Sequence, residues 1–313
     1  MIISLIYNKN PYVGSIEAVI GEKVQVCTTK EEALKFLPET ELIITIGGGN
    51  LAVPIDEEML NAAPLLKWVF SISAGVEKLP LKELKERGIL TTNTSGVHAV
   101  TIAEYVMGGL LVMSHHYDRY IPLKKERKWG GLISEEDMEG KTILVIGAGH
   151  IGSEIGRKAK AFDMRVLGLK RKVCTLEGFD EVYSMEQLKE VLPLADYVVM
   201  AAPLTPETHH LIGAEEFALM KNEAVFVNIA RGDTVKEQDL ITALTERTIK
   251  GALLDVFHEE PLPAESPLWE LDNVLITPHS SAISKNVIKK VIKMFEANYE
   301  KYKKGEKLIN ELY

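Results

Sequence analysis

The stretch that decides the fold is Thr142-Ile-Leu-Val-Ile146, which runs directly into Gly147-Ala-Gly149-His-Ile-Gly152. An apolar strand, a glycine-rich turn and a helical pattern follow one another here. Gly147 allows the tight turn, Gly149 lets the backbone approach a pyrophosphate, and Gly152 lets the helix pack closely on the sheet. The amide groups of His150 and Ile151, at the helix start, then face the anion. The stretch predicts dinucleotide binding; the alternative is a glycine turn that serves packing alone.

The next strand, Arg165–Leu169, ends in Lys170-Arg171-Lys172. A site for NAD usually has an acidic residue at this point, which bonds the ribose hydroxyls. A guanidinium instead grips a 2′-phosphate through paired hydrogen bonds. We therefore predict a preference for NADP, with Arg171 as the main contact and Lys170 or Lys172 as the second. The alternative is a basic loop that only contacts solvent.

Outward from this stretch, strands and helices alternate along both halves of the chain, which predicts doubly wound α/β domains with parallel sheets. Before residue 100 the predicted strands are Ile2–Tyr7, Lys23–Cys27, Leu42–Ile46, Lys67–Ser71 and Ile89–Thr92, and the helices are Thr29–Leu37, Glu57–Ala62 and Leu81–Arg87. After Gly140 the strands are Thr142–Ile146, Arg165–Leu169, Tyr197–Ala201, Ala224–Ile229, Gly251–Val256 and Val274–Ile276, with a helix in each of the five connections.

Three segments lie outside this alternation. Val100–His116 is apolar nearly all round, so we expect a buried helix at the junction of two domains. Tyr117–Glu139 is charged, and we expect it to be irregular. Ser284–Lys304 carries apolar residues on one helical face and lysines opposite, which predicts an amphipathic helix with a solvated basic face.

Length and composition set limits on the function. The 313 residues fit two domains at roughly 100–200 residues each. The net charge of −9 disfavours binding to nucleic acid or to an anionic membrane. Cys27 and Cys174 are too few for a disulfide framework and stand at no metal-ligand spacing, so we expect a reducing compartment and no metal. Because no signal peptide or membrane span is evident, we predict a soluble, cytoplasmic protein.

Five blocks in the order of one family carry a resemblance to the D-2-hydroxyacid dehydrogenases, which are NAD(P)-dependent oxidoreductases. They are Ser73-Ala-Gly-Val-Glu77, Gly147 to Gly152, Asn228-Ile-Ala-Arg-Gly232, Leu254-Asp-Val-Phe-His-Glu-Glu-Pro-Leu-Pro263 and Thr277-Pro-His279. The resemblance covers essentially the whole chain. It implies a Rossmann dinucleotide-binding domain, residues 98–282, inserted into a flavodoxin-like substrate domain, residues 1–97 plus 283–313. It also implies a homodimer formed through residues 100–139.

The resemblance places the catalytic arginine at Arg231, its acidic partner at Glu260 and the acid–base histidine at His279. Each residue type suits the reduction of a 2-keto acid. An arginine can hold the carboxylate and the carbonyl oxygen bidentately. A histidine can donate the proton near neutral pH, and an adjacent carboxylate stabilises and orients its imidazolium.

Further contacts are implied by the same resemblance. Asp255 would help to position the nicotinamide carboxamide, and the cofactor cleft would be lined by Ala202, Pro203, Ile229 and Ala230. The backbone amides of Ala74, Gly75 and Val76 would hold the substrate carboxylate. Two positions depart from the usual family pattern: Asp163 replaces a glycine, which a residue tolerant of the left-handed conformation permits, and Lys170 replaces an acidic residue, which changes the expected cofactor. His258 also stands where the family often has a carboxylate, and it receives no role.

The sequence therefore predicts hydride transfer between NADP(H), or NAD(H), and a small 2-keto or D-2-hydroxy acid. Glyoxylate and hydroxypyruvate are the favoured substrates, while D-lactate, a bulkier acid or the substrate of a short phosphoglycerate dehydrogenase stays open. The alternative from another class is a non-enzymatic, nucleotide-sensing protein, because the family resemblance extends to transcriptional corepressors built on this scaffold.

Overall fold

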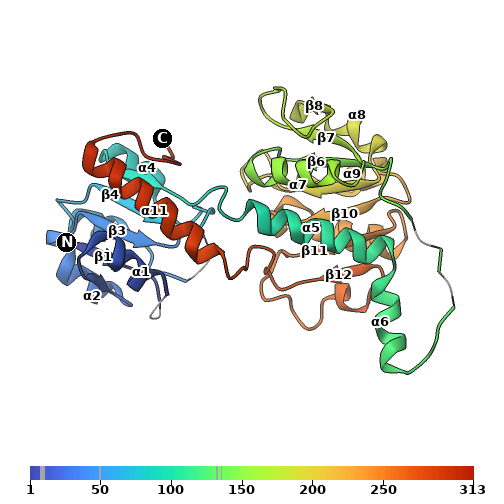
Figure 1. Cartoon of the computed structure of the whole chain (residues 1–313), viewed down its shortest axis with the longest axis horizontal. Coiled ribbons are helices and arrows are strands. Elements are labelled where there is room, and N and C mark those ends of the chain that lie inside the picture. Colours follow the sequence, from blue (N-terminus) through green and yellow to red (C-terminus); the bar gives the residue numbers. More distant parts are fainter. Residues whose placement is uncertain (8–10, 49–50, 132, 135) are drawn as a thin grey trace. The chain divides into compact units, whose positions relative to one another are not determined.

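The computed structural model describes residues 1–7, 11–48, 51–131, 133–134 and 136–313. The chain divides into two compact units, each with its own parallel sheet (Figure 1). Unit 1 comprises Met1–His98 and Ser284–Tyr313, and unit 2 comprises Ala99–Ile283. Unit 2 is therefore a continuous segment inserted between the two parts of unit 1.

Unit 1 contains a five-stranded sheet in the order β2-β1-β3-β4-β5, and all of its neighbouring strands are parallel. This is the flavodoxin-like order. The strands are β1 (Ile2–Ser4), β2 (Val24–Val26), β3 (Leu42–Thr45), β4 (Trp68–Ser71) and β5 (Leu90–Thr92). The five predicted strands of this half are confirmed, each one to three residues shorter than expected.

Helices cover both faces of this sheet, because its strands are apolar on both sides. One face packs against α1 (Pro11–Ile20) and the C-terminal helix α11 (Val287–Lys304), whose Val291 and Phe295 are buried. The other face packs against α2 (Lys30–Phe36), α3 (Glu57–Asn61) and α4 (Leu81–Glu86). The amphipathic pattern predicted for the C-terminal segment is thus confirmed.

Unit 2 contains a seven-stranded parallel sheet in the order β12-β11-β10-β9-β6-β7-β8. Its strands are β6 (Thr142–Ile146), β7 (Arg165–Leu169), β8 (Glu181–Tyr183), β9 (Tyr197–Met200), β10 (Val225–Asn228), β11 (Gly251–Leu254) and β12 (Val274–Ile276). The strand order reverses between β6 and β9. In open parallel sheets, ligands bind beyond the carboxyl ends of the strands at this reversal, so the topology itself selects where a site belongs.

Alternate residues of β6 enter the two cores of unit 2. Ile143 and Val145 pack with α5 (Ala99–Ser114) and α7 (His150–Lys160), which lie side by side on one face (Figure 1). Leu144 and Ile146 belong to the core on the other face, which is covered by α8 (Leu188–Val191), α9 (Ala214–Leu219) and α10 (Glu237–Thr245). The Rossmann architecture expected from the sequence is therefore confirmed.

The structure corrects the sequence analysis in four places. Helix α1 was not predicted, and the edge strand β8 was missed. The segment expected to be irregular, Tyr117–Glu139, begins with helix α6 (Tyr117–Lys125), which contains Pro122; residues 132 and 135 lie outside the described residues. The connection between β11 and β12 contains only the 3₁₀ helix Pro267–Glu270, because prolines at 261, 263 and 267 deprive this segment of the amide donors that an α-helix needs.

One smaller expectation is met. Asp163 adopts the left-handed conformation, with φ of 54°, so the replacement of glycine at this position is accommodated as predicted. Among the described residues, no helix combines the length and the apolar character needed to cross a membrane.

Candidate active site

The glycine-rich turn after β6 lies at the reversal of strand order. Gly147 has φ of 97°, and a Cβ atom there would approach the backbone nitrogen of Ala202, just after β9, to 2.5 Å. A Cβ on Gly152 would lie 2.4 Å from the carbonyl oxygen of Gly147. Neither position can accept a side chain, since real Cβ contacts are longer than 3.0 Å. Both glycines are therefore needed for the turn and for the packing of α7 on the sheet.

Gly149 differs from its two neighbours in the motif. A Cβ atom at this position would have nothing within 4 Å among the described residues. Gly149 is the N-cap of α7, and the described first turn of that helix has neither a side-chain cap nor an acidic residue. The amide dipoles at this end favour an anion, and the open space beside Gly149 fits a pyrophosphate group.

The basic loop Lys170–Lys172 follows β7 at the same edge of the sheet, and its Arg171 and Lys172 are exposed. The pKa of Glu207, in the loop after β9, is lowered mainly by hydrogen bonds from Thr205 and from its own backbone amide, and further by the positive charge of Arg171. Arg171 thus lies near enough to the β9 loop to act on it electrostatically. The two loops flank the reversal of strand order on either side of β6.

A histidine and a carboxylate meet beyond β11 and β12. Nδ1 of His279 lies 2.7 Å from Oε2 of Glu260. The other oxygen of Glu260 accepts a hydrogen bond of 3.1 Å from the amide of Phe257, so both oxygens of the carboxylate are bonded. The histidine itself has φ of 50°, a conformation that non-glycine residues adopt only when their surroundings impose it.

The surroundings that impose this conformation centre on Asp255, whose side chain is fully buried. Its Oδ1 accepts hydrogen bonds from Thr277 Oγ1 (2.6 Å) and from the amide of Ser280 (2.8 Å). Its Oδ2 accepts one from the amide of Ser281 (3.0 Å). The carboxylate therefore binds the loop on both sides of His279, a role that the sequence analysis did not assign.

Helix α5 supports the same loop through Tyr105, whose hydroxyl lies 2.7 Å from Thr277 Oγ1. Burial raises the pKa of Tyr105 to about 12, with the nearby Asp255 adding to the effect, so this phenol stays protonated and available as a hydrogen-bond donor. Tyr105 was not predicted as a site residue. The sequence predicts that Tyr105 lies in an apolar helix, but it gives no sign of the hydrogen bond between Tyr105 and Thr277.

Arg231 follows β10, on the turn Ile229–Gly232. Its backbone carbonyl accepts hydrogen bonds from Asn228 Nδ2 (3.1 Å) and Thr234 Oγ1 (2.7 Å), and Oδ1 of Asn228 accepts one from the amide of Ala230. Asn228 and Thr234 are buried and hold the turn from both sides. Their roles were missed, although Asn228 stands in one of the blocks that carry the resemblance.

In unit 1, the loop Ser73–Glu77 follows β4, again at a carboxyl end. Ser73 Oγ donates to the carbonyl of Gly75 (2.8 Å), and Asn93 Nδ2 donates to that of Ala74 (2.7 Å). Among the described residues, the amides of Ala74, Gly75 and Val76 donate no backbone hydrogen bond. The loop therefore presents three consecutive amide donors from a braced backbone.

Comparison with known proteins identifies the family. A family model described as "D-isomer specific 2-hydroxyacid dehydrogenase, NAD binding domain" matches residues 107–281. The chain is also 36% identical over 269 residues to a glyoxylate reductase from Korarchaeum cryptofilum, an alignment that covers 82% of this chain and 79% of the relative. The chain belongs to this family. Its members are NAD(P)-dependent dehydrogenases that act on the CH–OH group of a D-2-hydroxy acid.

Solved structures agree with the assignment. A D-isomer specific 2-hydroxyacid dehydrogenase family protein from Aeromonas salmonicida has a TM-score of 0.84 and 31% identity, with 100% of this chain and 98% of that chain covered. An NADPH-dependent glyoxylate/hydroxypyruvate reductase from Sinorhizobium meliloti, in complex with NADP and sulfate, has a TM-score of 0.82 and 27% identity, with 99% and 97% covered.

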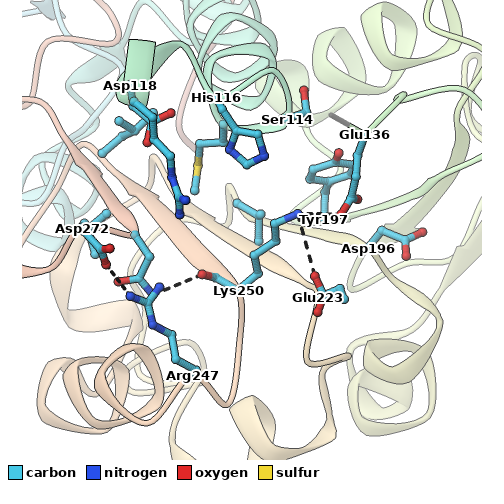
Figure 2. Close-up of a pocket in the computed structure, with 16 residues that line it drawn as sticks. Ser114, His116, Asp118, Glu136, Asp196, Tyr197, Glu223, Arg247, Lys250 and Asp272 are labelled. Atoms are coloured by element: carbon cyan, nitrogen blue, oxygen red, sulfur yellow. Dashed lines mark hydrogen bonds and ion pairs between the residues drawn. The ribbon is translucent and has the colours of Figure 1, made fainter. Parts of the chain in front are cut away.

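A cavity of about 110 Å³ in the dehydrogenase lies away from these residues, at the amino ends of the strands of unit 2 (Figure 2). Its lining includes Asp196, Lys250 and Asn273, which directly precede β9, β11 and β12, and Glu223, which lies two residues before β10. None of the predicted site residues lines it. Within the described part of the chain, no group of three or more His, Cys, Asp or Glu side chains could hold a metal ion.

Proposed function

We propose that this dehydrogenase reduces a small 2-keto acid to the D-2-hydroxy acid with NADPH, and that glyoxylate or hydroxypyruvate is the preferred substrate. The observation that carries the proposal is the 2.7 Å contact between His279 and Glu260 at the carboxyl edge of the sheet. A histidine held by a carboxylate is suited to proton transfer at a carbonyl oxygen. The names of the related glyoxylate reductases support the substrate class.

His279 is the proposed acid in the direction of reduction. With Nδ1 bonded to Glu260, Nε2 is the nitrogen left to face the substrate. A nicotinamide cofactor, when bound, supplies the hydride that adds to the keto carbon. His279 gives the proton on Nε2 to the oxygen of the same carbonyl group, which becomes the hydroxyl, and Glu260 stabilises the charged imidazolium before the transfer.

Arg231 is the proposed anchor of the substrate carboxylate and of the carbonyl oxygen. Its planar guanidinium can donate two parallel hydrogen bonds, which fix the keto acid in one orientation. The amides of Ala74, Gly75 and Val76 are proposed to bind the same carboxylate. Residues 1–97 and 283–313 would then form the substrate domain, and residues 98–282 the cofactor domain.

The cofactor residues are proposed in three groups. The amides and glycines of the turn would bind the pyrophosphate, and Arg171, with Lys170 or Lys172, would bind the 2′-phosphate that distinguishes NADP. The nicotinamide half would be contacted by Ala202, Pro203, Ile229 and Ala230. Asp255, which is fully buried, would help to position it through the loop that its carboxylate binds. The residues of the turn that would bind the pyrophosphate are Gly147, Gly149, His150, Ile151 and Gly152.

We further propose a cytoplasmic homodimer. Neither Cys27 nor Cys174 forms a disulfide, as a reducing compartment requires. The dimer would use residues 100–139, where Tyr117, Ile121 and Trp129 are exposed. Large apolar side chains in one exposed region are typical of an interface, and light scattering of the purified protein measures the state.

A panel of 2-keto acids assayed with NADPH and with NADH tests the proposed function. We expect the highest kcat/KM with glyoxylate or hydroxypyruvate, and a higher kcat/KM with NADPH than with NADH. A clear preference for NADH would refute the role of Arg171 in selecting the cofactor. Binding of NADPH without turnover of any acid in the panel would support the nucleotide-sensing alternative instead.

A further inference from the structure

A second carboxylate–histidine pair lies beside the first. Nδ1 of His258 is 2.5 Å from Oδ1 of Asp233, and the amide of His258 donates a 2.9 Å hydrogen bond to Oε2 of Glu237. Asp233 lies two residues after Arg231, and His258 lies two residues before Glu260. The pair therefore joins the loop that carries Arg231 to the segment that carries Glu260.

The two segments also touch through their backbones. A Cβ atom on Gly232 would lie 2.0 Å from the carbonyl carbon and oxygen of Phe257, and 2.3 Å from the amide nitrogen of His258. No side chain fits there, so the backbones are in direct contact. Asp233 and Glu237 thus bind His258 next to this contact and keep the two segments together.

We propose that His258 is a positioning residue, and that the Asp233–His258 pair holds Arg231 in register with Glu260 so that substrate affinity depends on the charge of His258. This inference rests on the proposed function, because it concerns how Arg231 binds the keto acid. It assigns no contact between His258 and the substrate.

The groups around His258 are acidic. The pKa of His258 is raised chiefly by the hydrogen bond to Asp233 and by the charge of that carboxylate, while partial burial opposes the shift and Glu237 and Glu259 add to it. The backbone carbonyl of Asp233 also accepts a hydrogen bond from the amide of His210. The histidine therefore keeps its charge to higher pH than an ordinary imidazole does, and the pair is charge-assisted wherever the imidazole is charged.

The sign of the pH effect follows from the raised pKa. The stabilisation is fully present below pH 6.5, the ordinary pKa of histidine, and is lost as the pH rises through the raised value in the folded protein. Arg231 should then be held less firmly, and the KM for the keto acid should rise on the alkaline side. The side chain of His258 is 66% exposed, so solvent screening limits the effect to a few-fold.

The test measures KM and kcat for glyoxylate with NADPH between about pH 6 and about pH 9. We expect His258→Gln and Asp233→Asn to raise KM about 3- to 10-fold near pH 6.5 with kcat within about two-fold, the range of one charged hydrogen bond that solvent weakens. The alkaline rise in KM of the wild type should disappear in both variants. His258→Lys, which keeps the charge to higher pH, should keep KM low beyond the pH at which the wild type loses affinity.

His209→Gln is the matched control, because His209 is an exposed histidine of a neighbouring loop whose ring lies against that of His210 at a tilt of 31°. Among the described residues it forms no ion pair with a carboxylate. It should leave the pH profile of KM unchanged. If His258→Gln and Asp233→Asn also kept the wild-type profile while glyoxylate was reduced normally, the positioning role would be refuted and the proposed function would stand.

A measurement without substrate distinguishes a failure of this inference from a failure of the proposed function. Hydrogen exchange of the amides in residues 231–235 should be faster in His258→Gln than in the wild type at neutral pH, and the NMR titration of His258 should move to lower pH in Asp233→Asn. Equal exchange rates and equal titrations would overturn the inference, whether or not the enzyme reduces glyoxylate. Faster exchange in a protein that reduces no keto acid would leave the pair intact and refute only the proposed function.

Discussion

The two edges of the seven-stranded sheet of unit 2 are both rich in charge, but they pair their charges differently. At the carboxyl edge, histidines meet carboxylates: His279 with Glu260, and His258 with Asp233. At the amino edge, around the cavity in Figure 2, which His116 also lines, the ion pairs with carboxylates are made by lysines and arginines. Lys250 lies 2.7 Å from Glu136 and 3.8 Å from Glu223 there.

The difference lies in what each pair can do near neutral pH. The pKa of Glu136 is lowered mainly by its hydrogen bond to Lys250, and the pKa of Lys141 is raised mainly by its hydrogen bond to Glu136. Such a pair stays charged across the physiological range and exchanges no proton. A histidine in such a pair can gain and lose its proton near neutral pH. The type of cation therefore distinguishes the edge proposed to be catalytic better than the density of charge or the presence of a cavity.

The largest effect should follow from removing the proton donor. His279→Gln keeps a polar side chain of similar reach but cannot deliver a proton, so kcat should fall about 10²- to 10⁴-fold. The Kd of NADPH should stay within about two-fold, because the proposed cofactor contacts do not include the imidazole. Steady-state kinetics and fluorescence titration measure the two quantities.

Lys250→Met is the control at the opposite edge for that experiment, since it removes a charge of unit 2 with no proposed part in the reaction. Its kcat should match the wild type. A comparable loss of turnover in both variants would contradict the distinction between the edges, and full activity in His279→Gln would contradict the proton-transfer assignment.

The next effect concerns the cofactor, and one strand provides both variant and control. Arg171 follows the carboxyl end of β7, whereas Arg165 begins the same strand and pairs with Glu181. Arg171→Ala should raise the KM for NADPH about 10- to 100-fold, the range expected for lost hydrogen bonds between charged groups, and should barely change the KM for NADH. Arg165→Ala should leave both values unchanged. Equal KM values for NADPH in all three proteins would refute the assignment of Arg171.

Much of the fold could be predicted because the strands of unit 2 are apolar runs bounded by glycine or charge. Thr142–Ile146 and Arg165–Leu169 have the predicted bounds. The missed elements lack such signals. Helix α1 begins at Pro11 and contains Gly14, β8 is a three-residue edge strand that begins with Glu181, and α6 holds a proline. Neighbours distant in the sequence stabilise such elements, and local propensity understates them.

The residues of the candidate site also differ in how far the sequence could predict them. Arg231, Glu260 and His279 could be proposed because the family resemblance assigns them, and because each also follows a strand of a parallel sheet whose strands end at one edge. The supporting roles of Tyr105 and Asp255 could not be predicted, since both residues act through hydrogen bonds between segments far apart in the sequence. Residue type alone also failed to give His258 a role, because its partner is 25 positions away.

The smallest effect should come from the amino edge. Lys250→Met removes the main partner of Glu136, and both side chains are only about one-third exposed. We expect a loss of about 0.5–1 kcal/mol in the free energy of unfolding at pH 7, since solvent screens such pairs. Because the pKa of Glu136 is lowered in the folded protein, this stabilisation is present above pH 4.5, the ordinary value for glutamate, and is lost as the pH falls through the lowered value.

Thermal unfolding followed by circular dichroism at neutral and acidic pH measures that difference. The Tm of Lys250→Met should fall by about 2–4 °C or less at neutral pH, and the gap to the wild type should close in acid. Lys250→Arg, which keeps the charge, should stay near the wild type. A gap that persisted in acid would contradict the assignment, because it would show that Lys250 stabilises the fold by contacts other than its ion pair with Glu136.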